Sequence, residues 1–239
     1  MTSYLTATRH PWVCFLFVLP LLATYEGGIH YLSGTDPHAL RNGADVWLRW
    51  GLQRYGIQSI WAAPALVMGL LLIRTWAMWA TRPKDPFTAL FGMAIESVLF
   101  AAGLWIVARN IEPFLQQWSA PAVNVVFHTP AVGQVITYVG AGVYEEVLFR
   151  LGLYSVMYFF LRIVLVPRFA AVGLAAVAAS VMFAAAHHIG PNGEEMNAVR
   201  FGFRLLAGLY FTVLYVARGF GVAVGAHAGY DILVGVSVG

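Results

Sequence analysis

Charged residues are scarce in this 239-residue sequence, because Asp, Glu, Lys and Arg together make up only 10% of it. A soluble domain of this length would have about 25% charged residues. Hydrophobic residues account for 60% of the chain. Such a chain has too few polar groups to cover its surface in water, so the composition excludes an ordinary soluble enzyme. It indicates a polytopic helical membrane protein.

Cysteine and long basic runs are also lacking. The single cysteine, Cys14, excludes an intramolecular disulfide, and its apolar surroundings favour a packing residue over a reactive thiol. The formal charge of +3 comes largely from arginines that flank apolar segments, and the sequence has no basic run of the kind that binds nucleic acid. We therefore expect the lipid bilayer, and no nucleic acid, as a partner.

Apolar runs predict about seven spanning helices, since each span needs about 20 mostly apolar residues. The predicted spans are 11–31, 57–80, 87–108, 131–166, 169–189, 201–217 and 219–238. We expect 131–166 to be one long bent helix rather than two helices broken near Gly152. The segment 46–55 alternates Trp and Arg, which suits a helix at the membrane interface. The stretch 109–129 is a connection and a candidate re-entrant segment.

These spans predict an all-α fold, a transmembrane bundle of about seven to eight helices forming one domain over 1–239. Arg9 and the apolar run after it have the outline of a signal peptide, but no convincing small-x-small cleavage site follows, so we expect a retained helix. With the N-terminus inside, inner loops would hold seven Lys or Arg residues and outer loops six. That bias is too small to fix the orientation.

Ionisable residues inside three of the apolar segments are the most informative feature. The patterns are Glu145-Glu146-x-x-x-Arg150, Phe183-x-x-x-His187 and His227-x-x-x-Asp231. Charged groups at membrane depth are costly and by default mark a functional site. Because the three patterns fall on three different apolar helices, they predict one buried polar site.

Helical spacing separates the two glutamates. Glu146 and Arg150 are four residues apart and share a helix face, which favours a compensating ion pair. Glu145 lies about 100° round the helix and can face a cavity, as a candidate general base. A purely structural role is as well supported as a catalytic one for Glu146 and Arg150, and is the less favoured interpretation of Glu145.

Histidine positions suggest the remaining roles. His187, one turn after Phe183, can hold a water against Glu145 and share its proton. His227 and Asp231 lie on one helix face, and this pair can stabilise an oxyanion, with His227 as donor and Asp231 orienting it. A satisfied buried histidine and an interhelical hydrogen-bonded pair are the structural alternatives. The opposite face of the last helix has a ladder of small residues that permits close packing: Gly221, Gly225 and Gly229.

The three motifs, in this order, resemble those of the CPBP family of intramembrane glutamic endopeptidases, which includes CAAX prenyl proteases and bacteriocin-processing proteins. The resemblance covers about 131–238, the expected catalytic core. It implies hydrolysis of a peptide bond in a membrane-anchored protein or peptide, with no metal and no cofactor. It also implies that Glu145 and His187 activate water while His227 and Asp231 form the oxyanion hole. Compact loops suit a multi-pass protein of a prokaryotic inner membrane.

Two positions depart from the family pattern. The prenyl-protease branch usually has asparagine where this chain has Asp231, which weakens an assignment to CAAX substrates. The glycine common after the motif arginine is displaced by one residue, because Leu151 precedes Gly152.

Other functional classes have weaker signals. The sequence has no His-Glu-x-x-His motif for zinc and no Gly-x-Ser-x-Gly around a serine. A transporter would share the buried charges, but the sequence has no repeat to support it. A membrane scaffold or immunity-type protein also stays open. Substrate identity, oligomeric state and the roles of Glu26, Glu96 and His188 are not assigned, and Glu194 and Glu195 are expected to be solvated loop charges.

Overall fold

A computed structural model of the chain describes residues 3–32, 34, 40–116, 131–189 and 193–237, in which all regular structure is helical. The helices are α1 (Tyr4–Arg9), α2 (Pro11–Leu32), α3 (Gly43–Arg54), α4 (Ala62–Ala77), η1 (Trp79–Thr81), α5 (Phe87–Gln116), α6 (Ala131–Glu146), η2 (Val147–Tyr154), α7 (Ser155–Ile163), α8 (Arg168–Ala186), α9 (Ala198–Arg218) and α10 (Phe220–Ser237).

The predicted all-α transmembrane architecture is confirmed. In the described part of the chain, four helices are long and apolar enough to cross a membrane, namely α2, α5 as far as Asn110, α8 and α9, while α4 and α10 are shorter apolar helices. The helix predicted over 46–55 forms as α3, and its place at the membrane interface stays a prediction. The candidate re-entrant stretch begins as the end of α5, and its residues 117–129 lie outside the described part of the chain.

The predicted long helix over 131–166 is present as one helical run, α6–η2–α7, that ends at Ile163. Its middle part, η2, is a π-helix rather than an α-helix, with hydrogen bonds that span one residue more than in an α-helix. The hydroxyl of Ser155 donates to the carbonyl of Arg150, five residues earlier, at 3.0 Å. Gly152 lies within this segment and does not break the run.

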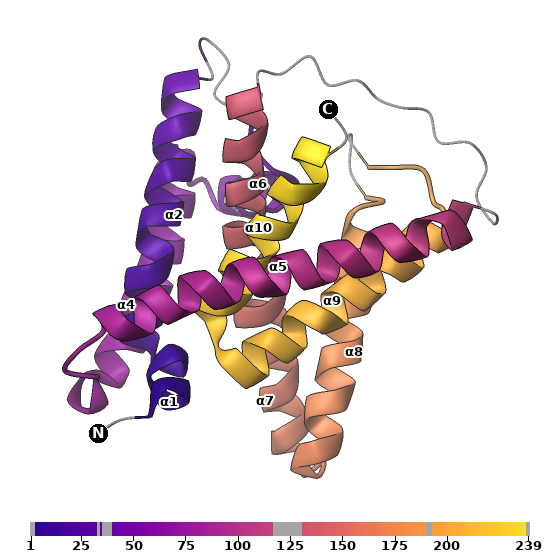
Figure 1. Cartoon of the computed structure of the whole chain (residues 1–239). Helices are drawn as coiled ribbons and strands as arrows, with labels where there is room; N and C mark the ends of the chain where they lie inside the picture. Colours follow the sequence, from indigo (N-terminus) through magenta and orange to yellow (C-terminus); the bar gives the residue numbers. More distant parts are fainter. Residues whose placement is uncertain (1–2, 33, 35–39, 117–130, 190–192, 238–239) are drawn as a thin grey trace.

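Three helices from distant parts of the chain, α2, α6 and α10, lie side by side, and α5 crosses them obliquely (Figure 1). Their apolar faces share one core that includes Val18, Val143 and Val224. In the same view α8 and α9 flank this group on the side away from α2. Because α10 contacts α2, α5, α6 and α9, it is the central helix of the bundle.

Glycines let α10 approach its neighbours closely. The predicted glycine ladder packs against α5, where an added Cβ at Gly221, Gly225 or Gly229 would lie 2.4, 2.4 and 3.1 Å from Met93, Ser97 and Ala101. On the other side, a Cβ added to Gly142 of α6 would lie 2.7 Å from Ala228 of α10. The predicted close packing through glycine is confirmed, and it holds the His227 region of α10 against α6.

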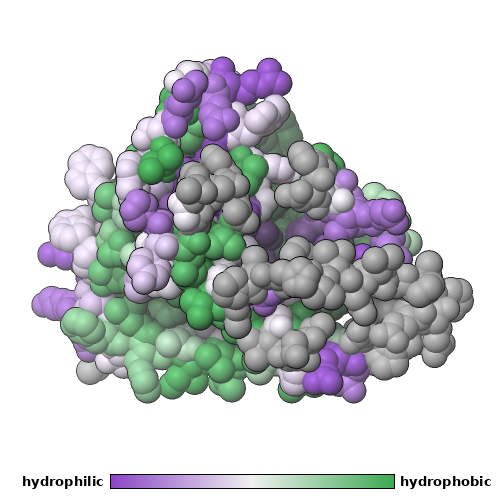
Figure 2. Space-filling view, turned by 90° about the horizontal axis from the view of Figure 1, so that it is seen from above, coloured by the Kyte–Doolittle hydropathy of each residue, from purple (hydrophilic) through white to green (hydrophobic). Residues whose placement is uncertain are grey.

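Large apolar side chains remain exposed on the outer helices. Phe91 and Leu99 on α5 and Phe169 on α8 are 71%, 65% and 93% exposed. Apolar residues form broad areas over the flank visible in Figure 2, and hydrophilic residues gather in separate patches. An outer surface of this kind is suited to contact with lipid.

Candidate active site

A buried ion pair links the first motif to two other helices. The carboxylate of Glu146 and the guanidinium of Arg150 are 2.9 Å apart, and both side chains are almost fully buried. This contact is ionic by distance but lacks hydrogen-bond geometry. Arg150 Nη2 donates to the carbonyl of Gly208 on α9 at 3.1 Å, and its guanidinium lies 4.6 Å from the centre of the Phe183 ring on α8. The pair therefore ties η2 to α8 and α9.

Glu146 also holds His227. The Nδ1–H group of His227 donates to the same oxygen, Glu146 Oε1, at 2.8 Å. Phe211 of α9 stacks on the imidazole, with ring centres 4.4 Å apart and an interplanar angle of 12°. This hydrogen bond joins residues 81 positions apart, so no spacing rule could reveal it. It fixes the ring of His227 and directs Nε2 toward Glu145 and Asp231.

Glu145 faces both motif histidines. Its Oε2 atom lies 3.9 Å from His187 Nε2 and 3.8 Å from His227 Nε2, and its side chain is 13% exposed. Both distances exceed a direct hydrogen bond, and separations of this size are compatible with a bridging water. Within the described part of the chain, Oε2 is buried and has no hydrogen-bond partner. The carboxylate is thus close to two imidazole rings and hydrogen-bonded to neither.

His187 stands directly after the last residue of α8, one turn beyond Phe183 as the spacing predicts. Its Nδ1–H group donates to the carbonyl of Phe183 at 2.8 Å, and the two rings meet edge to face at 5.0 Å. A carbonyl can only accept, so in the neutral ring Nε2 carries the lone pair. That lone pair faces Glu145.

Asp231 lies at the more open side of the site. Its Oδ2 atom is 3.6 Å from His227 Nε2, and its side chain is 24% exposed. The sequence pattern suggests Asp231 as the group that orients His227, whereas the orienting hydrogen bond comes from Glu146. The structure brings all seven predicted site residues together around Glu145, His227 and the ring of Phe183.

Among the described residues, no group of three or more His, Cys, Asp or Glu side chains is arranged to hold a metal ion.

A second buried polar cluster lies beside the site and includes Glu26, for which the sequence indicated no partner. The hydroxyl of Tyr144, the residue before Glu145, donates to Glu26 Oε1 at 2.5 Å. Arg41 and Arg49 lie 3.3 and 3.4 Å from the Glu26 carboxylate. The same arginines pair with Asp45 at 2.6 and 2.7 Å. Because two carboxylates meet two guanidinium groups, the cluster is formally neutral, and it holds α6 against α2 and α3.

Two other acidic residues also have partners. Glu96 of α5 forms a bidentate pair with Arg218, whose Nη2 lies 2.5 Å from Oε1 and 2.7 Å from Oε2. The expectation that Glu194 is simply solvated is corrected, because its carboxylate lies 2.5 Å from Arg204 although 41% of the side chain is exposed. Glu195 is exposed as predicted.

The loop after α8 folds back onto its end. The amide of Glu194 donates to the carbonyl of His187 at 2.9 Å, and its own carbonyl accepts from His188 Nδ1 at 3.0 Å. His188 is half-buried in the turn. Partial burial raises the pKa of Glu194, but the hydrogen bond and charge of Arg204, with the charge of Arg200, lower it further, so the pKa lies below its ordinary value.

Residues 127–233 match a family model described as type II CAAX prenyl endopeptidase, Rce1-like. The chain carries an Rce1-like domain of the CPBP family. No curated protein and no solved structure was found to match. The Rce1-like domain confirms the resemblance seen in the motifs, and every predicted site residue lies inside it. Four apolar helices among the described residues, together with a domain similar to a membrane protease family, indicate an integral membrane protein.

Proposed function

We propose that the chain is an intramembrane glutamic endopeptidase that hydrolyses a peptide bond of a membrane-anchored protein or peptide with water. One observation carries this proposal. Oε2 of Glu145, which has no hydrogen bond to any described residue, faces Nε2 of His187 and of His227 at 3.9 and 3.8 Å, in an almost buried setting. A carboxylate between two imidazoles is a suitable general base for water.

Glu145 and His187 would activate the nucleophile. Glu145 takes a proton from the water, whose oxygen attacks the carbonyl carbon and forms a tetrahedral oxyanion. The lone pair on His187 Nε2 accepts a hydrogen bond from the same water, because Nδ1–H is already donated to Phe183. The proton held by Glu145 then passes to the leaving amine nitrogen, and the carbon–nitrogen bond breaks. The products are a carboxylic acid and an amine.

His227 would stabilise the oxyanion. With Nδ1–H donated to Glu146, a proton on Nε2 makes the ring cationic, and that proton points to the side where Glu145 and Asp231 lie. The three neighbouring carboxylates favour this cation electrostatically. An imidazolium placed there before the reaction stabilises negative charge as it develops on the substrate oxygen. Arg150 offsets part of the local negative charge and positions Glu146.

The whole chain, 1–239, would act as a single transmembrane domain with 131–238 as its catalytic core. Packing of α2 against α6 and α10, and of α5 against α10, supports this, since the first helices contact the motif helices directly. We place the protein in a prokaryotic inner membrane. Asp231 in place of asparagine argues for a substrate class wider than prenylated CAAX termini.

Cleavage of a membrane-anchored peptide library by the purified chain tests the proposal. We expect Glu145→Gln and His187→Ala to lower the cleavage rate at least about a hundredfold, within the range for loss of a general base. Glu195→Gln is the matched control, because Glu195 is an exposed carboxylate in the loop after α8, and it should cleave normally.

Unchanged cleavage in both site variants would overturn the assignment. Loss of cleavage after addition of a metal chelator would instead identify a metal-dependent protease. Substrate uptake into proteoliposomes with no cleaved product would instead identify a transporter.

A further inference from the structure

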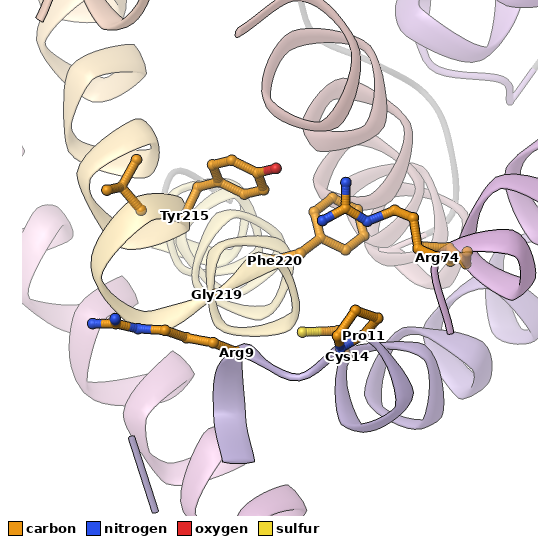
Figure 3. A pocket seen from close by; sticks show the side chains of 9 residues that line it. Arg9, Pro11, Cys14, Arg74, Tyr215, Gly219 and Phe220 are labelled. Atoms are coloured by element: carbon orange, nitrogen blue, oxygen red, sulfur yellow. The ribbon is translucent and has the colours of Figure 1, made fainter. Parts of the chain in front are cut away.

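A cavity of about 250 Å³ lies away from the proposed catalytic residues, where α1, α2, α4 and the α9–α10 turn meet (Figure 3). Its charged lining residues are Arg9 and Arg74. Apolar side chains, among them Leu71 and Phe220, form the rest of its walls together with the buried Cys14. In Figure 3 the Arg74 side chain reaches from α4 toward the ring of Phe220, and Arg9 extends along another side of the cavity.

The two arginines differ in what they already bind. Arg9 donates from Nε and Nη2 to the carbonyl of Ala217, which ties α1 to the end of α9 and leaves Nη1 available. Arg74 has no hydrogen bond and no ion pair with any described residue. Among the described residues, no acidic side chain lines this cavity. The cavity therefore presents uncompensated positive charge.

The backbone at the cavity is held in place by Gly219. Its φ of +103° is a conformation that other residues rarely adopt. An added Cβ there would lie 2.7 Å from the carbonyl oxygen of Thr8 and 2.9 Å from Arg9 Cα. The α9–α10 turn is thus pressed onto the end of α1, so the position of Arg9 is fixed by packing and by two hydrogen bonds.

The cavity lies at the level where spans begin and end. The apolar span of α2 begins at Pro11, and that of α9 ends at Arg218, both next to lining residues. The same end of the molecule holds α1, the end of α4 and the α7–α8 turn (Figure 1). Further basic residues occur in these connections: Arg82, Lys84, Arg162 and Arg168. A positively charged hollow at the end of apolar spans is placed at the depth of lipid headgroups.

We propose that this cavity is a binding site for a phosphate group, supplied by the headgroup of an anionic phospholipid. A guanidinium matches phosphate oxygens with paired hydrogen bonds. The apolar walls at Leu71 and Phe220 suit the start of the acyl region. The site is separate from the proposed catalytic residues and does not depend on the proposed hydrolysis.

Binding of short-chain phosphatidylglycerol to the purified full-length chain, measured by native mass spectrometry, tests this site. We expect Arg74→Gln to raise the Kd about tenfold, the loss of one charge-assisted contact. Arg74→Lys keeps the positive charge but loses the paired hydrogen-bond donors of the guanidinium group, and it should raise the Kd less than Arg74→Gln. Arg168→Gln removes the same charge at the same end of the molecule but outside the cavity, and should change the Kd less than about twofold. Far-UV circular dichroism checks that all variants fold.

Two further binding measurements distinguish a lipid headgroup from free phosphate as the ligand. Phosphatidylcholine of the same chain length should bind more weakly, because the choline ammonium of its zwitterionic headgroup offsets the negative charge of the phosphate and is repelled by the arginines. Inorganic phosphate that stabilises the unmutated chain but not Arg74→Gln, with no phosphatidylglycerol binding, would assign the site to free phosphate. The proposal would be overturned if Arg74→Gln and Arg168→Gln weakened lipid binding equally, or if both lipids bound with equal affinity. Either result would indicate only non-specific electrostatic attraction between lipid and protein.

Discussion

Glu146 is the residue on which the site depends structurally, because one oxygen contacts both Arg150 and His227. Its neighbour Glu145 has a different environment, with a buried oxygen that has no hydrogen-bond partner among the described residues. The two adjacent glutamates therefore differ in role: Glu146 is bound by neighbouring side chains, whereas Glu145 keeps an oxygen free of hydrogen bonds to the described residues. The difference can be measured by removing each charge in turn.

We expect Glu146→Gln to lower both stability and cleavage, because it breaks a buried ion pair and leaves Arg150 uncompensated. The loss of stability should be about 3 kcal/mol. Glu145→Gln should abolish cleavage but cost less stability than Glu146→Gln, since no hydrogen bond to a described residue is broken and the nearest cationic atom, His227 Nε2, is 3.8 Å away. Chemical unfolding in detergent together with cleavage rates measures both quantities. Equal loss of stability in the two variants would contradict the division of roles.

At the scale of single residues, the sequence predicted contacts between side chains four positions apart on one helix, but not contacts between helices. The Glu146–Arg150 pair and the Phe183–His187 contact follow from helical spacing. The hydrogen bond from His227 to Glu146 depends on how α10 packs against α6, so it was not predictable from either motif. Glu26 and Glu96 were left without partners for the same reason, because their arginines lie in other parts of the chain.

At the scale of the helix, Gly225 determines how closely α10 meets α5. A Cβ at this position would lie 2.4 Å from Ser97 Oγ and 2.9 Å from the Phe17 ring. We expect Gly225→Ala to destabilise the protein by about 1–3 kcal/mol through overpacking. The matched control is Gly103→Ala on α5, where the added Cβ would meet no atom of the described residues within 4 Å beyond its own stretch of helix. Thermal unfolding should show a lower midpoint for the first variant alone, and equal midpoints would contradict the close approach.

Tyr144 connects the catalytic helix to the polar cluster around Glu26. Tyr144→Phe removes the hydroxyl that donates to Glu26 and leaves a buried carboxylate oxygen short of one hydrogen bond, a cost of about 1–3 kcal/mol. Because Tyr144 precedes Glu145, we expect kcat to fall several-fold while KM stays nearly constant.

Tyr158→Phe on α7 is the control, with a ring that stacks on Tyr154 away from Glu26. An unchanged kcat in Tyr144→Phe, with a lower unfolding midpoint, would show that the cluster stabilises the fold without positioning Glu145.

Helix positions were largely predictable because long apolar runs must be buried or face lipid. The spans at 11–31 and 169–189 correspond closely to α2 and α8. The π-helix after Glu146 could not be predicted from hydrophobicity, because its wider turn changes hydrogen bonding without changing which residues are apolar. The ladder of glycines was predictable as a packing face, but its partner α5 was not.

For the molecule as a whole, stability toward acid should depend on Glu194. Its pKa is lowered in the folded chain, so its contribution is present above the ordinary pKa of a glutamate and is lost as the pH falls through the lowered folded value. We expect the unfolding midpoint of Glu194→Gln to fall less than that of the unmutated chain between about pH 5 and pH 3. Parallel pH profiles would show that the Glu194–Arg204 pair contributes nothing to stability.

The π-helix also has a consequence for the length of the chain. A π turn holds one residue more than an α turn, and Leu151 is the residue that separates Arg150 from Gly152 within it. Deleting Leu151 would therefore let the segment close as an α-helix, with the residues before and after keeping their places. We expect this shortened chain to fold and to retain cleavage.

Deleting Val143 instead would turn the preceding part of α6 by about 100° relative to Glu145 and Glu146 and should abolish both folding and cleavage. Loss of folding in both deletions would show that the wide turn is required. Retained folding in the Leu151 deletion alone would mark this turn as a site where the length of the chain can change by one residue without moving the catalytic groups.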